Sequence, residues 1–209
     1  MKRLNPFLKD PIRGSVMNTS KHVPEFEERT ALLRAVLKSQ YHAALAMLRE
    51  AIHKCPEELW FSERYKNACW QIAYHTLYFT HLYLQPDEKS FRPWEHHQAN
   101  VQHPDGFGPP QPDNPLPVIP RPYTQEEALM YWDFCDAMVD RAVDALDLDS
   151  PHSGFSWCKV PKLEHQLVNI RHIEHHMAQL ADRLRSSAEI GVRWVSAVRQ
   201  EEASSEQRR

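Results

Sequence analysis

Hydrophobic residues recur every three or four positions through most of the chain, which is the spacing of an amphipathic helix. The pattern predicts four helices, over about residues 27–54, 63–84, 124–146 and 161–186. The third begins with Thr124 followed by Glu127, a capping-box pattern, and the fourth begins at Pro161, which suits a first helical turn. The chain is therefore expected to be all-α, as a four-helix bundle.

The second and third predicted helices are separated by a proline-rich segment. Residues 86–122 hold ten of the sixteen prolines, so the segment cannot form regular structure. We expect a long crossover loop, which lets the two flanking helices run in the same direction or lie across the bundle. The loop is either a simple connector or a cover over one end of the bundle.

Three regions follow from these patterns. Residues 1–26 form an N-terminal extension, residues 27–186 form the bundle with its loop at 86–123, and residues 187–209 form a polar tail. In the tail, Gly191 interrupts a short helix suggested over 192–198.

Composition and charge exclude several classes of partner. The 209 residues carry a net charge of only -3, and Lys and Arg are spread along helix faces, so no nucleic-acid partner is expected. No run of 18 apolar residues occurs and the start of the chain lacks a signal-peptide pattern, so we expect a cytoplasmic protein without a membrane partner. The four cysteines form no CxxC pair and are interpreted as buried thiols, with Cys69 and Cys158 near a pocket as the alternative.

The most informative residues are histidines. His172 and His176 are four residues apart in the fourth predicted helix, so both can direct an imidazole at one ion. His75 lies within the apolar second segment, where metal coordination would hold its ring neutral. Three neutral imidazoles suit one divalent transition metal ion, zinc or nickel first, with iron or manganese as further options.

Alternatives remain for each of these positions. His75 could be a core histidine bonded to a carbonyl, and His172 and His176 could form a polar helix face.

The remaining histidines carry weaker signals. His175 is an alternative ligand or a supporting group, and His165 either lines the mouth of the site or lies on the surface at the start of the helix. Helical spacing places His81 on a different face of its helix from His75. Three histidines of the loop are expected to be exposed unless the loop brings one of them to the metal: His96, His97 and His103.

Other catalytic motifs are absent from the sequence. There is no HExxH, HxxEH, His-Asp pair, GxSxG, P-loop or GxGxxG, and Glu174 lies about 160° around the helix from His172. No acidic residue falls at helical spacing beside His75 or His172, so no general base is identified. Asn169, one turn before His172, either orients a ligand or packs between helices.

The segment Leu-Val-Asn-Ile-Arg-His-Ile-Glu-His-His-Met-Ala-Gln-Leu, residues 167–180, resembles the last helix of DinB-like proteins, a superfamily that includes YfiT-type hydrolases. The resemblance covers residues 27–186 and implies a four-helix bundle with a three-histidine metal site, often a homodimer. By motif, His75 matches the ligand of helix two, and His172 and His176 match the pair in the final helix. The loop at 86–122 departs from the family.

The resemblance also implies a class of chemistry. Related bundles are S-transferases or isomerases that use a low-molecular-weight thiol such as bacillithiol or mycothiol, and others are metal-dependent hydrolases. Such a metal ion can lower the pKa of bound water to about 7 and ionises a bound thiol still more readily. We therefore expect an enzyme acting on a small molecule, with a non-catalytic metal-containing bundle that binds a ligand or protein as the alternative.

Overall fold

A computed structural model describes residues 22–99, 101–103 and 121–198. These residues contain five helices and no β-strand, so the described chain is all-α, as expected. The helices are α1 (His22–Lys54), α2 (Glu57–Trp60), α3 (Cys69–Tyr83), α4 (Gln125–Ala145) and α5 (Lys162–Ala188). Among the described residues, no helix combines the length and apolar character needed to cross a membrane.

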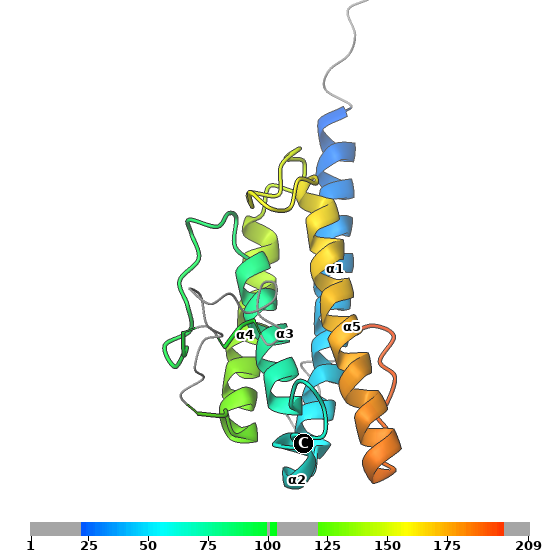
Figure 1. The fold of residues 1–209 in the computed structure, drawn as a ribbon. Coiled ribbons are helices and arrows are strands. Elements are labelled where there is room, and N and C mark those ends of the chain that lie inside the picture. Colours follow the sequence, from blue (N-terminus) through cyan, green and yellow to red (C-terminus); the bar gives the residue numbers. More distant parts are fainter. Residues whose placement is uncertain (1–21, 100, 104–120, 199–209) are drawn as a thin grey trace, which may run out of the picture.

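The four long helices pack around a shared core. Helix α1 packs on α4 and α5, and α3 packs on the same two helices. Figure 1 shows that α1 and α5 run in one direction while α3 and α4 run in the other. Helices α3 and α4 are thus parallel, one of the two arrangements that the long connection was expected to allow. Their shared core is built from large, fully buried side chains, including Tyr41, Leu48, Trp60, Tyr74, Leu77, Tyr131 and Ile173.

Two helix boundaries differ from the prediction. Helix α1 begins at His22, five residues earlier than expected. The second long helix begins at Cys69 and not at 63, because residues 61–68 form turns. The Gln71 side chain accepts a hydrogen bond from the backbone N–H of Ala68 (2.7 Å), which caps this later start. The structure also has a short helix, α2, that the hydrophobic pattern did not predict.

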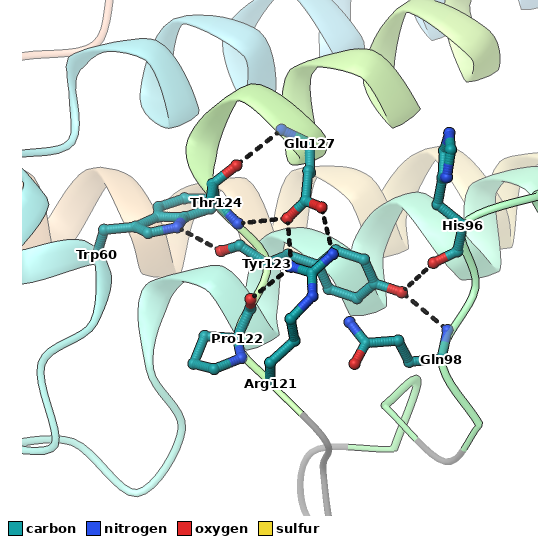
Figure 2. A network of polar contacts seen from close by, with 8 residues as sticks. All are labelled: Trp60, His96, Gln98, Arg121, Pro122, Tyr123, Thr124 and Glu127. Carbon is teal, nitrogen blue, oxygen red and sulfur yellow. Dashed lines mark hydrogen bonds and ion pairs between the residues drawn. The ribbon is translucent and has the colours of Figure 1, made fainter.

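The predicted cap of α4 is confirmed. Thr124 Oγ1 accepts from the Glu127 backbone N–H (3.2 Å), and Glu127 Oε2 accepts from the Thr124 backbone N–H (2.9 Å), as Figure 2 shows. The preceding residue, Tyr123, is completely buried, and its carbonyl accepts from Trp60 Nε1 (2.9 Å). The start of α4 is therefore fixed to α2.

Tyr123 also ties the described part of the proline-rich segment to the helices. Its hydroxyl donates to the carbonyl of His96 (2.6 Å) and accepts from the backbone N–H of Gln98 (2.8 Å; Figure 2). Trp94 is buried and stacks on Tyr131 of α4 at 4.5 Å between ring centroids. Residues 94–98 thus pack against α3 and α4. Most of the remaining loop, residues 104–120, lies outside the described residues.

The described tail, residues 189–198, has no regular secondary structure, so the suggested helix over 192–198 is wrong. Helix α5 ends where Glu189 adopts a left-handed conformation (φ 58°), and residues 189–198 then run back along α1. Three side chains of α1 bind the backbone of the tail and so compete with helix formation. Lys54 Nζ donates to the Gly191 carbonyl, and Gln40 donates to the Ser196 carbonyl. Glu50 accepts a hydrogen bond from the Arg193 N–H. From the tail, Val192 and Val195 pack against the core.

Candidate metal centre

Three histidines from two helices converge where α3 packs on α5. His75 comes from the middle of α3, and His172 and His176 come from successive turns of α5. Each offers one ring nitrogen, and these three nitrogens all lie within 4.8 Å of one another. The Nε2 atoms of His75 and His172 are 3.0 Å apart. Within the described residues this is the only group of three or more His, Cys, Asp or Glu side chains that could hold a metal ion.

One pair of ring nitrogens lies near the separation that a tetrahedral ion requires. Zinc–nitrogen bonds of about 2.0–2.1 Å at tetrahedral angles place two ligand nitrogens about 3.4 Å apart. The Nε2–Nε2 separation of 3.0 Å between His75 and His172 is close to that value. All three histidines are half-buried, so the group lies near the surface, within reach of a small molecule.

The electrostatic environment keeps His172 neutral. Its pKa is lowered to about 3, chiefly by burial and then by the neighbouring imidazoles of His176, His75 and His175, which disfavour another positive charge. A neutral imidazole retains the lone pair that a metal ligand needs. In the absence of an ion, the same 3.0 Å contact could be an Nε2–H···N hydrogen bond between His172 and His75.

The loop supplies the hydrogen-bond partner of His75. His75 Nδ1 lies 2.6 Å from the carbonyl oxygen of Gln102, so Nδ1 carries the proton and donates it. This arrangement leaves the lone pair on Nε2, the atom that faces His172. Val101, just before Gln102, is completely buried and anchors this part of the loop. The sequence did not identify the Gln102 carbonyl because a backbone acceptor has no sequence signature.

Gln179 supports the second histidine pair. Its side-chain oxygen is 2.8 Å from His176 Nδ1, which makes Nδ1 of His176 a donor and leaves Nε2 for an ion. The Gln179 amide nitrogen lies 3.5 Å from Nε2 of His175. His175 itself is exposed and is not in the metal-binding group, so the structure gives its ring no place among the three converging nitrogens.

Other histidines lie elsewhere. His165 is completely buried between Tyr83 and Phe155, so the expectation of a surface position is wrong. Burial is the main reason that the pKa of His165 is lowered to about 4. His81 faces α4, where its Nδ1 lies 3.1 Å from the Tyr131 hydroxyl, as the predicted difference in helix face requires. In the loop, His96 is exposed, whereas His97 is half-buried and its Nδ1 lies 2.6 Å from the Tyr74 hydroxyl.

Among the loop histidines, His103 is connected to the three-histidine group through ring contacts with Phe79. Its ring is 5.9 Å from Phe79, and Phe79 packs against both His75 (4.8 Å) and His172 (5.5 Å). Burial lowers the pKa of His103, which favours its neutral form. Phe79 follows His75 by one helical turn, so its position beside the site was recoverable from helical spacing, whereas that of His103 was not.

Two aromatic residues and one cysteine of α3 belong to the hydrophobic core: Trp70, Tyr74 and Cys69. Trp70 and Tyr74 are buried, and Tyr74 stacks on Tyr123 at 4.4 Å, so core packing is their main role. Cys69 is buried at the start of α3, where hydrogen bonds from Cys55 and then Arg183 lower its pKa to about 7 against the effect of burial. Cys158 is half-buried in the turn before α5.

Comparison of the chain with protein-family profiles, with curated proteins and with solved structures yields no match. The functional argument therefore rests on the residues of this chain and on the resemblance of residues 167–180 to the last helix of DinB-like proteins.

Proposed function

We propose that the protein is a DinB-type four-helix bundle that binds one divalent transition metal ion through His75, His172 and His176 and uses it in thiol-dependent S-transfer to a small molecule. The observation that carries the proposal is the convergence of three ring nitrogens within 4.8 Å from two helices. The same three positions match the histidine pattern of DinB-like proteins in sequence spacing, which supports the proposal.

The protein side chains prepare the site for such an ion. His75 and His176 each donate Nδ1–H to an oxygen, on Gln102 and Gln179 respectively, which leaves the Nε2 lone pair of each ring to bind an ion. His172 is neutral because burial and its neighbouring imidazoles depress its pKa. When bound, a divalent ion with three neutral ligands would act as a Lewis acid that favours the anionic form of a thiol or water at its open position.

The donor set favours S-transfer over hydrolysis. Among the described residues no Asp, Glu or Cys joins the three histidines, so the group contains no carboxylate to take a proton from water. A thiol needs less help, because its proton is lost more readily than that of water. The low-molecular-weight thiol would be a cosubstrate, and the acceptor would be a small electrophile.

Hydrolysis is the second candidate, and His103 is the observation that favours it. Its half-buried, neutral imidazole contacts Phe79, which packs on two of the three metal-site histidines. A neutral imidazole in this position is suited to accept a proton from an attacking water. Removal of His103 separates the two candidates, because only hydrolysis depends on that base.

The function is tested by turnover with zinc- or nickel-loaded protein. Thiol conjugation is measured with a chlorodinitrobenzene-type electrophile and a panel of low-molecular-weight thiols, and hydrolysis is measured with nitrophenyl esters. We expect thiol conjugation that is lost in His75→Ala and retained in His103→Ala. Ester hydrolysis lost in both variants would favour the second candidate.

The matched control is His42→Ala, which removes a half-buried histidine at the interface of α1 and α4, away from the three-histidine group. It should retain metal and turnover. Metal binding without turnover on either panel would contradict the enzymatic proposal and favour a bundle that binds a ligand or protein without catalysis.

A further inference from the structure

The three metal-site histidines differ in how their second ring nitrogen is supported. His75 Nδ1 has the Gln102 carbonyl at 2.6 Å, and His176 Nδ1 has the Gln179 side-chain oxygen at 2.8 Å. His172 Nδ1 is buried and has no hydrogen-bond partner among the described residues. A buried ring nitrogen of this kind costs free energy unless it is paired, and a metal-ligating histidine almost always donates from this position. His172 therefore lacks the support that the other two possess.

An unpaired acceptor lies one turn away on the same helix. Asn169 is completely buried, and its Oδ1 also has no partner among the described residues. Residues three apart on a helix lie on the same side, with an axial rise of about 4.5 Å between them. The unpaired donor position of His172 and the unpaired oxygen of Asn169 are therefore neighbours on the inner side of α5.

The orientation of the Asn169 amide is fixed by other contacts. Its Nδ2 donates to the carbonyl of Thr80 on α3 (3.3 Å). A hydrogen bond from Asn169 also lowers the pKa of the Tyr41 hydroxyl, against the larger effect of burial, and this is the effect of an N–H donor. A flipped amide would direct its oxygen at the Thr80 carbonyl, which cannot donate. Oδ1 is thus the atom left to accept a hydrogen bond, and its NH₂ group is held by α3 and α1.

We propose that Asn169 is the positioning residue of His172: its Oδ1 accepts the Nδ1–H of His172 through one buried water molecule and so directs Nε2 into the metal site. The bridge is needed because the two atoms, both buried, form no direct hydrogen bond with each other. All three ligands would then share one arrangement, with Nδ1–H donating to an oxygen and Nε2 facing the ion. The inference rests on the proposed metal site and deepens it.

The test measures zinc affinity by competition with a chromophoric chelator, without any activity assay. Asn169→Leu keeps the size of the side chain but removes the acceptor, and we expect a loss of about 10- to 100-fold in affinity. Asn169→Asp keeps an oxygen at the same place and should bind zinc within about threefold of the wild type. Cobalt-loaded Asn169→Leu should also show a shifted visible spectrum, because one ligand ring is no longer held in place.

The matched control is Gln166→Leu. Gln166 is another completely buried amide on α5, three residues before Asn169, and its contacts are with Tyr41 and the carbonyl of Tyr83. Both Leu variants remove a buried hydrogen-bonding amide and should lower the melting temperature. Only Asn169→Leu should change zinc affinity. Equal affinity losses in Asn169→Leu, Asn169→Asp and Gln166→Leu would show that Asn169 acts only in packing and would overturn the inference.

Nitrogen-15 NMR of the zinc-loaded wild type gives an answer that does not depend on how the variants fold. We expect the His172 ring to be protonated at Nδ1 and coordinated through Nε2. Coordination through Nδ1 would overturn the inference. Zinc binding that is retained by the wild type and lost in His172→Ala, together with unchanged affinity in Asn169→Leu, would reject the role of Asn169 and leave the metal site intact.

Discussion

Histidines occupy two helix interfaces of this protein in opposite electrostatic settings. Between α1 and α4, His42 has Asp136 at 2.7 Å from Nδ1 and Asp140 at 3.2 Å from Nε2, so both ring nitrogens face carboxylates. The hydrogen bond to Asp136 raises the pKa of His42 against the effect of burial. Between α3 and α5, His172 faces other imidazoles and its pKa falls to about 3. For His42 the hydrogen bond to a carboxylate outweighs burial, whereas for His172 burial is the larger cause of the low pKa and the neighbouring imidazoles add to it.

The difference assigns separate roles to the two interfaces. A protonated His42 joins two helices as a cation between acids, which is a structural role. The neutral His172 lies in a group of three histidines without a carboxylate, where a lone pair can be satisfied by a cation or by a donated proton. The comparison is tested by perturbing each interface and asking whether metal affinity and stability respond separately.

The largest expected effect is the removal of a ligand. His172→Ala should weaken zinc binding by at least about a hundredfold, because two imidazoles remain and the ion loses a charge-neutral donor from α5. Chelator competition measures the affinity, and His42→Ala serves as the control at the other interface. An equal loss of zinc in both variants would remove the distinction between the two interfaces.

A smaller effect is expected for the residue that supports His176. Gln179→Leu removes the oxygen that lies 2.8 Å from His176 Nδ1, and zinc affinity should fall by about tenfold. Gln179 is exposed, so the melting temperature of the metal-free protein should hardly change. A large loss of stability without a change in affinity would show that Gln179 supports the helix and not the site.

The α1–α4 interface should respond to pH. The pKa of His42 is raised in the folded protein, so its stabilising contribution is complete below the unfolded value of about 6.5 and is lost as the pH rises through the folded pKa. His42→Leu should therefore cost about 1 kcal/mol at about pH 6, and less at about pH 9. Urea unfolding of both proteins across this range measures the gap; a gap that grows with pH would contradict a protonated His42.

The smallest effect is expected where the loop meets the helices. Tyr123→Phe removes the hydroxyl that binds the His96 carbonyl and the Gln98 N–H, at a cost of about 1 kcal/mol. Hydrogen exchange should become faster over residues 96–103, and zinc affinity should fall by about two- to threefold because the Gln102 carbonyl is held less firmly. Faster exchange in α5 with no change in the loop would contradict this anchoring role.

The sequence predicted the parts of the fold that depend on local pattern. The stripe on α1, the Thr124–Glu127 cap and the i, i+4 spacing of His172 and His176 are all properties of one helix, and each is present in the structure. The irregular conformation of the tail depends on contacts between distant residues, such as Lys54 with Gly191. Those contacts override local propensity and leave no periodic signal.

The candidate site divides in the same way. The three histidines were identifiable because their spacing and their apolar surroundings are unusual, and Phe79 follows His75 at a helical interval. The Gln102 carbonyl could not be predicted, since it comes from an irregular loop and acts through its backbone. The burial of His165 was missed because the turn that carries Phe155 folds back over the start of α5, a tertiary contact that helical position does not encode.

The central claim is that His75, His172 and His176 hold one metal ion. Its most direct test is elemental analysis of protein purified without a histidine tag, after exposure to zinc, nickel, manganese and iron, beside the His75→Ala, His172→Ala and His42→Ala variants. The account predicts close to one ion per chain in the wild type and in His42→Ala, and almost none in the other two. A wild type that remains free of all four metals, or His75→Ala and His172→Ala variants that retain the ion, would contradict it.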